Sequence, residues 1–290
     1  MPLVHAFIVL LVIFFPMSRA KDHPSRSVCF NTSARSGRIV GGSDAKRNEM
    51  PFVVSLTRRG GHFCGATILS ERWLITAAHC LCNSQNDFMK ATQIRAVLGL
   101  HRISEYKGAP LRGDSGEKIL PVEVPLESFK IHPEYNCLRA ANDIALLRVK
   151  PIEFTTTIQP SCIATEDTPV NSVATVMGWG WTHENQSVGQ RADTLQKAQV
   201  HVWPNSQCQM SFKSHEKSIV ITEEQLCAGK ESGGVDACWA DSGGPLVSTE
   251  GLLIGIVSTG IGCARPDLPG IYTRVTKYAN WIKGVIESST

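Results

Sequence analysis

The chain has 290 residues, an ordinary hydrophobic content of 42% and a formal net charge of only +3. Its lysines and arginines are scattered rather than gathered in a stripe, so we expect no nucleic-acid-binding surface. The length suits one large all-β unit or two packed barrels rather than a small module.

The chain begins with an apolar run. Residues 3–16 are almost entirely hydrophobic but too few to span a bilayer comfortably, and Ala20 precedes a charged segment. We predict a signal peptide over residues 1–20 and hence a secreted, extracellular product. The alternative is a signal anchor, because no lysine or arginine precedes the run. No second apolar run follows, so the mature chain is expected to make no membrane contact.

Residues 21–38 are polar and lack periodicity, which is typical of a pro-segment rather than a domain. From residue 39 to residue 290 we predict one folded unit. Short β-rich runs there are separated by clusters of Gly, Pro, Asn and Ser, as at 52–56, 66–69, 94–98, 144–147 and 173–177. This pattern predicts an antiparallel all-β architecture, and the lack of strand and helix alternation argues against an α/β fold.

The last segment, residues 275–287, has a helical period instead. Its apolar side chains recur at helical spacing: Tyr278, Trp281, Ile282, Val285 and Ile286. We predict one amphipathic helix that closes the chain, with these side chains as packing anchors rather than a ligand site.

The segment Asp236-Ala-Cys-Trp-Ala-Asp-Ser-Gly-Gly-Pro245 carries the first chemical signal. The glycines and proline after Ser242 predict a tight turn that presents the hydroxyl. A serine becomes a nucleophile only beside a base, and the base needs an acid to orient it. Upstream motifs supply both: His79 in Thr-Ala-Ala-His-Cys, and Asp143 in Asp-Ile-Ala-Leu-Leu.

Together with Arg38-Ile-Val-Gly-Gly42, these motifs resemble the signature set of the chymotrypsin-like serine proteases, over residues 39 to about 286. The resemblance implies two antiparallel six-stranded β-barrels, divided near Gln159, with the active site in the cleft between them. It also implies that Ser242 is the nucleophile, His79 the general base and Asp143 the residue that orients it.

Ten cysteines in a secreted chain indicate disulfides. The resemblance implies four pairs: Cys64 with Cys80, Cys208 with Cys227, Cys238 with Cys263, and Cys29 with Cys162. Cys82 and Cys137 are left over and would pair beside the catalytic residues, in a bridge not common to the family. A metal cluster at residues 79–82 is the competing interpretation, which an oxidising compartment disfavours. We expect no cofactor and no metal, including calcium, because Leu100 stands where the family's first calcium-binding glutamate would be.

Asp236 matches the base of the family's primary specificity pocket, where a buried carboxylate is costly unless a cation neutralises it. Three further residues match the pocket walls: Ser258, Gly260 and Gly270. Ala237 stands where many trypsin-like relatives carry serine. The missing hydroxyl favours a guanidinium, which pairs bidentately with a carboxylate, so we predict cleavage after arginine more than after lysine.

The resemblance also implies a zymogen. Cleavage after Arg38 would free the Ile39 amine to pair with Asp241.

Expected partners are protein or peptide substrates, an activating trypsin-like protease and protein protease inhibitors, and the product is expected to be a monomer. Asn31 and Asn185 begin glycosylation sequons.

Two positions depart from the family pattern. Ala240 replaces a glycine whose N–H, with that of Ser242, forms the oxyanion hole, and Thr259 replaces a tryptophan that offers an apolar shelf to residues before the cleaved bond. Alanine either keeps the amide in place or turns it away, at a cost of about a hundredfold in rate. The alternative function is therefore a protease-fold binding or regulatory protein. An α/β-hydrolase esterase does not fit, because that fold places its histidine after the serine.

Overall fold

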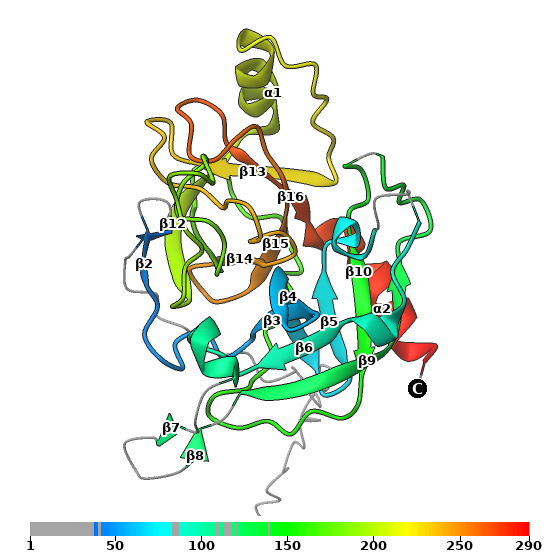
Figure 1. The fold of residues 1–290 in the computed structure, drawn as a ribbon. Helices are drawn as coiled ribbons and strands as arrows, with labels where there is room; N and C mark the ends of the chain where they lie inside the picture. The colour runs from blue at the N-terminus through cyan, green and yellow to red at the C-terminus, as the bar shows by residue number, and fades with distance from the viewer. Residues whose placement is uncertain are drawn as a thin grey trace, which may run out of the picture.

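The computed structural model describes residues 38–39, 42–82, 87–107, 111–112, 118–119, 121–138 and 140–289. The predicted signal peptide, nearly all of the predicted pro-segment, Cys29 and Asn31 lie outside these residues. Figure 1 shows two lobes, each built on a curled antiparallel sheet.

The first lobe is a closed six-stranded barrel in the order β10-β5-β4-β3-β6-β9. Its strands are β3 (Val53–Arg58), β4 (Gly61–Ser70), β5 (Trp73–Thr76), β6 (Arg95–Leu98), β9 (Val122–Ile131) and β10 (Ala145–Val149). Every neighbouring pair is antiparallel. Branched and aliphatic side chains fill the barrel, including the fully buried Leu56, Ile68, Leu74, Leu98 and Leu146.

The second lobe closes in the same way, through β12-β11-β14-β15-β16-β13 and back to β12. Its strands are β11 (Val173–Gly178), β12 (Gln196–Trp203), β13 (Gln225–Gly229), β14 (Pro245–Ser248), β15 (Leu253–Thr259) and β16 (Gly270–Arg274). The prediction of two antiparallel six-stranded barrels is confirmed. One hydrophobic cluster continues across the junction, because Trp179, Val247 and Ile256 of the second lobe join the core of the first.

Among the described residues, four short strands lie outside the barrels. β2 (Gly42–Asp44) pairs with the edge of β12, and β1 (Arg38–Ile39) pairs with β2 in parallel. β7 (Leu111–Arg112) and β8 (Lys118–Ile119) form a small hairpin. Three short 3-10 helices of the described part of the first lobe, Ala78–Leu81, Ala91–Gln93 and Ile103–Lys107, lie between its strands.

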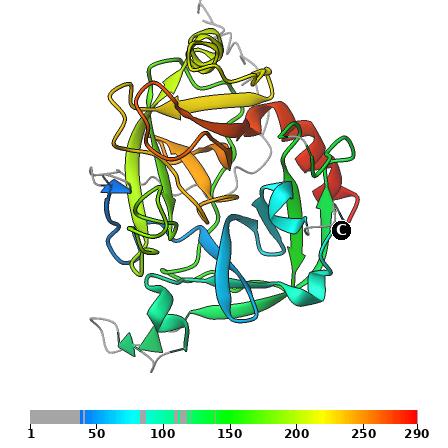
Figure 2. The ribbon, with the colours of Figure 1, turned by 45° about the horizontal axis from the view of Figure 1, so that its top comes forward.

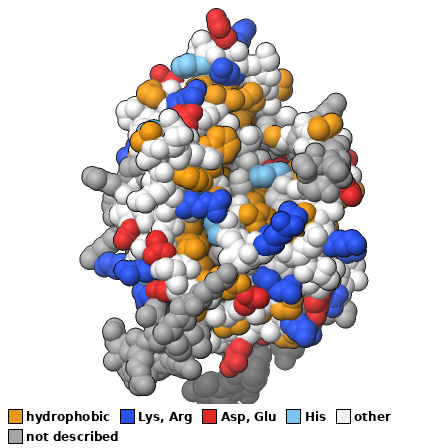
Figure 3. All heavy atoms as spheres, in the orientation of Figure 1, with side chains coloured by type: hydrophobic (Ala, Val, Ile, Leu, Met, Phe, Trp, Pro, Cys, Tyr) orange, Lys and Arg blue, Asp and Glu red, His pale blue; other side chains and the backbone are white. Residues whose placement is uncertain are grey.

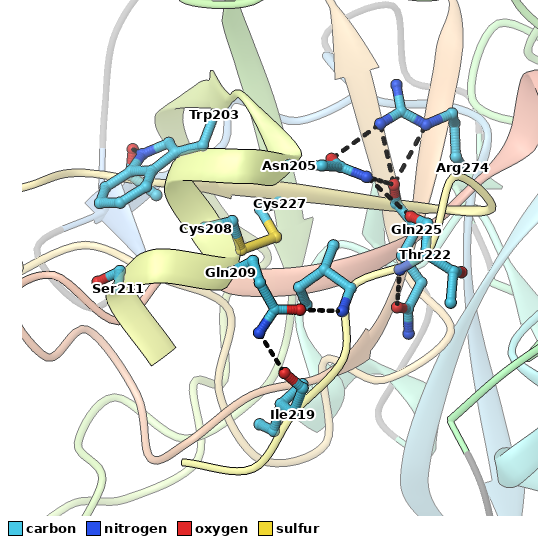
Figure 4. The surroundings of a disulfide bond; sticks show 12 residues. Trp203, Asn205, Cys208, Gln209, Ser211, Ile219, Thr222, Gln225, Cys227 and Arg274 are labelled. Carbon is cyan, nitrogen blue, oxygen red and sulfur yellow. Dashed lines mark hydrogen bonds between the residues drawn. A yellow bond between two sulfur atoms is a disulfide. The ribbon is translucent and has the colours of Figure 1, made fainter. Parts of the chain in front are cut away.

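A helix that the sequence analysis missed, α1 (Asn205–Ser214), projects from the second lobe. Its sequence has no apolar stripe, and of its ten residues only Cys208 and Phe212 are buried. Its position instead depends on the Cys208–Cys227 disulfide and on side-chain hydrogen bonds (Figure 4). Gln209, for example, contacts the backbone of Ile219 and Ile221.

The C-terminal segment is helical, but it is not one continuous helix as predicted. A 3-10 turn over Val275–Tyr278 leads into α2 (Ala279–Glu287). Figures 1 and 2 show that this helix crosses from the second lobe to lie against the first. Tyr278 and Ile282 are buried in the first lobe's core, and Trp281 packs on the ring of His132. The apolar side chains are therefore packing anchors.

This packing predicts that Ile282→Ala lowers the free energy of unfolding by about 3 kcal/mol, because it leaves a cavity under α2. Ile282 is 2% exposed. The matched control is the neighbouring Lys283→Ala, where the side chain is 72% exposed and the loss should stay below about 0.5 kcal/mol. Urea unfolding of both variants would measure the difference. Equal losses would contradict the packing.

Candidate active site

A cavity of about 490 Å³ lies where the two lobes meet, and its lining includes His79, Asp143 and Ser242. In Figure 3 hydrophobic side chains form a band down the middle of this face, over the junction of the lobes. The three residues come from separate segments, so only the docking of the two barrels brings them together.

Ser242 lies in the turn before β14. Gly243 follows with a φ of +77°, and a Cβ there would overlap Thr76 Oγ1, so the turn requires glycine. The Ser242 carbonyl accepts a hydrogen bond from the Gly65 N–H of β4 at 2.7 Å. The serine loop of the second barrel is thereby fixed to the first.

His79 lies in the 3-10 turn that follows β5, and the neighbouring Cys80 is bridged to Cys64 of β4. The imidazole Nδ1 lies 2.7 Å from Asp143 Oδ2, and the His79 backbone N–H donates to Oδ1 at 2.8 Å. These two contacts fix both the position and the orientation of the ring.

Asp143, which is 2% exposed, also binds the second barrel. Ser258 Oγ donates to its Oδ2 at 2.5 Å, and Thr273 Oγ1 donates to its carbonyl at 2.7 Å. The sequence analysis assigned Ser258 only to the specificity pocket and missed Thr273. No motif surrounds either residue to mark this contact.

The electrostatics of the pair favour an ionised acid and a basic imidazole. Burial alone would raise the pKa of Asp143, but the charge and hydrogen bonds of His79, with the Ser258 hydroxyl, lower it. Burial would likewise lower the pKa of His79, and the attraction to Asp143 raises it above 6.5. The imidazole is thus suited to accept a proton near neutral pH.

Among the described residues, Ser242 Oγ has no hydrogen-bond partner, although it shares the cavity with His79. Such contacts often tighten only when a substrate binds. The backbone N–H groups of Ala240 and Ser242 also donate to no described residue. Two neighbouring amides without acceptors, beside a serine hydroxyl, can bind a developing oxyanion.

Ala240 adopts a φ of +74°, in the left-handed region that favours glycine. Its carbonyl lies 3.0 Å from His62 Nε2, and Ser55 Oγ lies 2.8 Å from Nδ1 of the same ring. Burial lowers the pKa of His62 to about 4, so the ring is neutral, donates to Ala240 and accepts from Ser55. His62 is a second residue that the sequence analysis missed.

Asp236, which is 4% exposed, lies in the cavity wall with Ser258, Gly260 and Gly270. Its two oxygens accept the backbone N–H groups of Ala237 at 2.8 Å and Ala264 at 3.2 Å. Burial raises its pKa to about 7, and the charge of Asp241 adds to the shift.

Gly270 keeps this part of the cavity open, because a Cβ there would lie 2.7 Å from Asp236 Oδ1. A Cβ at Gly260 would meet only ordinary contacts. The hydroxyl of Tyr272, in the same wall, is buried and has no hydrogen-bond partner among the residues described. An acid and a phenol therefore form a polar end to the cavity.

Asp241 is fully buried, and its carboxylate accepts the N–H groups of Gly180 at 2.8 Å and Cys238 at 2.9 Å. It forms no ion pair with any residue in the described ranges, and burial raises its pKa to about 6. The chain is continuous through Arg38 and Ile39, which lie in β1 at the sheet edge.

The described part of the chain contains four bridges between cysteines that the sequence analysis paired: Cys64–Cys80, Cys82–Cys137, Cys208–Cys227 and Cys238–Cys263. Cys162 is also disulfide-bonded, and Cys29 lies outside the described residues. Because Cys80 and Cys82 are both bridged, neither is a free thiolate that could bind a metal ion.

Comparison with known proteins agrees with this geometry. The Trypsin family model matches residues 39–282. The solved structure of neuropsin, a serine protease expressed in the limbic system of mouse brain, aligns with a TM-score of 0.70 and 27% identity. That alignment covers 84% of this chain and 97% of neuropsin. The chain therefore belongs to the trypsin family, that is, to the chymotrypsin-like serine proteases.

Among curated proteins, the Suppressor of tumorigenicity 14 protein homolog of Bos taurus is 38% identical over 261 residues, and Transmembrane protease serine 9 of Rattus norvegicus is 38% identical over 258 residues. Each alignment covers 87% of this chain but only 28% and 22% of the respective relative. The chain thus spans less than a third of their length. Of the helices in the described ranges, none is both long and apolar enough to cross a bilayer.

The positive φ at residue 240 predicts that Ala240→Gly raises the free energy of unfolding by about 1 kcal/mol, because glycine adopts this conformation without a Cβ penalty. The matched control is Ala77→Gly, where φ is −76° and glycine should lower stability by a similar amount. Thermal unfolding of both variants would measure this. A loss of stability in Ala240→Gly would contradict the strain.

Proposed function

We propose that this chain is the zymogen of a secreted serine endopeptidase that hydrolyses peptide bonds after arginine, and less well after lysine. One observation carries the proposal: the cavity that contains His79, Asp143 and Ser242 ends at Asp236, a buried carboxylate without a cationic partner among the described residues. A substrate side chain that carries a positive charge would supply the missing partner.

The proposed chemistry follows the family mechanism. Ser242 Oγ attacks the substrate carbonyl while its proton passes to His79 Nε2, and Asp143 stabilises the imidazolium through Nδ1. The carbonyl oxygen becomes an oxyanion held by the amides of Ala240 and Ser242. His79 then protonates the leaving amine, and water hydrolyses the acyl-enzyme by the same steps. The unpaired amides and the raised pKa of His79 support these roles.

The arginine preference rests on the shape and polarity of the far end of the cavity. Both oxygens of Asp236 already accept one backbone N–H each, and each keeps a lone pair for a planar guanidinium. Ala237 offers no hydroxyl there to solvate a compact ammonium ion. Lysine should therefore bind less well than arginine.

We further propose that cleavage after Arg38 activates the chain. The new Ile39 amine would pair with Asp241, whose buried carboxylate lacks a cation. Gly178 and Gly180 support this role, because a Cβ at either would overlap the Asp241 carboxylate. Because Asp241 lies beside Ser242, the ion pair would couple activation to the oxyanion hole.

Other proposals rest on the sequence alone: the signal peptide (1–20), the pro-segment (21–38) joined through Cys29 and Cys162, the monomeric state, the activating protease, and inhibitor binding.

Glycosylation is proposed at two sequons. Asn185 is exposed, and Asn31 lies outside the described residues.

The activity is tested with matched peptide substrates that carry Arg, Lys or Phe before the cleaved bond. After cleavage at Arg38, turnover should fall in the order Arg, Lys, Phe, with Phe at background. Ser242→Ala should lower kcat by at least about 10⁴-fold, and Arg38→Gln should keep the chain inactive. If the cleaved chain turns over no substrate and Ala240→Gly does not rescue it, the binding-protein alternative is favoured.

The raised pKa of Asp236 predicts a pH dependence for cation binding. Below about pH 7 the acid is mostly neutral, so the affinity for an arylamidinium probe such as benzamidine should rise as pH increases through this value. From about pH 6 to about pH 8 the ionised fraction, and with it the affinity, should increase about tenfold. Calorimetry on cleaved Ser242→Ala protein measures it. In the Asp236→Asn control both the binding and this pH dependence should be lost, and an unchanged affinity would contradict the assignment.

A further inference from the structure

Asp143 lies in a tight turn of three residues. The Asn142 carbonyl accepts a hydrogen bond from the Ile144 N–H at 2.8 Å, which closes the turn around Asp143. Asn142 has a φ of +55°, in the left-handed region that asparagine tolerates better than most residues. The direction of the Asp143 side chain therefore depends on how firmly this irregular backbone is held.

Tyr278 holds the first residue of the turn. It ends the 3-10 turn that precedes α2, it is 4% exposed, and its hydroxyl donates to Asn142 Oδ1 at 2.9 Å. Burial raises the pKa of this phenol, and the carboxylates of Glu224, Asp143 and Glu134 raise it further. The hydroxyl therefore keeps its proton, and can donate to Asn142, over the whole neutral pH range.

His132 holds the last residue of the turn and completes a ring of contacts. Its N–H donates to the Ile144 carbonyl at 3.1 Å, and its imidazole packs edge to face against the Tyr278 ring, with 5.3 Å between the centroids. Trp281 of α2 packs on the same imidazole at 5.2 Å. Burial lowers the pKa of His132, against the opposing charge of Glu134, so the ring is neutral near pH 7. The C-terminal segment is thus joined to both ends of the turn.

The carboxylate of Asp143 has little room for misalignment. Its Oδ1 accepts the His79 N–H at 2.8 Å, and its Oδ2 lies 2.7 Å from His79 Nδ1 and accepts the Ser258 hydroxyl at 2.5 Å. Because these contacts come from two separate segments, a rotation of the main chain at residue 143 would lengthen at least one of them. Tyr278 is absent from the described lining of the cavity, so any effect on catalysis must pass through Asn142.

We propose that Tyr278 is a positioning residue for the reaction, which holds Asn142 and thereby keeps the Asp143 carboxylate aligned with His79. The proposal rests on the proposed function, in which Asp143 orients the general base. Without the phenolic hydroxyl, the Asn142 side chain loses its donor, and the left-handed main chain at residue 142 can relax and turn Asp143 with it. The attraction between Asp143 and His79 then weakens, because it depends on the distance and direction of two hydrogen bonds.

Tyr278→Phe removes only this hydroxyl, and its effect is measured on the chain cleaved after Arg38 with the arginine peptide substrate. The value of kcat should fall about tenfold, with KM unchanged to within about twofold, because the substrate pocket is not altered. The acid limb of the kcat profile should move down by about half a pH unit as the pKa of His79 falls. The matched control is Tyr106→Phe, which removes a hydroxyl that contacts Glu123 on the first barrel and should change neither value.

A double-mutant cycle with Asn142→Gly tests the route. Glycine keeps the positive φ at residue 142 but removes the side-chain acceptor, so kcat should fall by a similar factor. Because both variants remove the same contact, the double variant should be slower than either single variant by no more than about twofold. Multiplicative losses in the double variant would overturn the proposal. So would a Tyr278→Phe variant that loses thermal stability but keeps the wild-type kcat and acid limb.

A measurement without turnover separates this proposal from the proposed activity. His79 is titrated by NMR in cleaved Ser242→Ala protein that carries isotope-labelled histidine, and its signals are identified by their loss in His79→Ala. The pKa of His79 should fall by about half a unit when Tyr278→Phe is added and stay unchanged when Tyr106→Phe is added. Such a shift supports the positioning role even if no peptide is cleaved. Equal pKa values in all three proteins overturn it even if cleavage after arginine is observed.

Discussion

One buried carboxylate, Asp143, joins the two barrels at the point where catalysis would occur. It lies just before β10 of the first barrel. Its side chain and carbonyl nevertheless accept hydroxyl hydrogen bonds from Ser258 and Thr273 of the second barrel. The same carboxylate holds His79 through two contacts. Any shift between the barrels would therefore break bonds to a buried charge, which is among the most costly defects in a folded protein.

Asp236 and Asp241 are buried as deeply as Asp143, but they lack its cationic partner within the described structure. Backbone N–H groups partly satisfy each carboxylate, and burial raises both pKa values. Burial of these two acids without a cation therefore lowers the free energy of unfolding of the unliganded, uncleaved chain. Because the folded-state pKa values lie above the usual 3.8, the loss of stability is absent below about pH 4, grows as pH rises towards about 6 for Asp241 and about 7 for Asp236, and is complete above these values. On the proposed function, a substrate cation at Asp236 and a new terminal amine at Asp241 would each restore this stability, so binding and activation would both stabilise the fold.

Much of the fold and the principal site could be predicted from the sequence, because local motifs carry them. Three motifs identify the candidate catalytic His, Asp and Ser: Thr-Ala-Ala-His-Cys, Asp-Ile-Ala-Leu-Leu and Asp-Ser-Gly-Gly-Pro. The short β-rich runs, with the family resemblance, predict the two barrels. The helix α1 could not be found in this way, since its position depends on a disulfide and on tertiary hydrogen bonds rather than on an apolar stripe. The start of α2 was also misplaced, because a 3-10 turn and an α-helical turn share nearly the same apolar spacing.

The contacts of Ser258, Thr273 and Tyr278 could not be predicted, because each acts on a residue 115 to 136 positions earlier in the chain. Ala240 illustrates the opposite case. The sequence marks the alanine as unusual, but only the structure reveals the compensation: neutral His62 donates to the Ala240 carbonyl and so opposes rotation of the strained peptide. A hydrogen bond to a neutral donor contributes about 1 kcal/mol, which is similar to the strain of an alanine at positive φ. The two contributions are of the same size, so the chain can tolerate alanine at a glycine position.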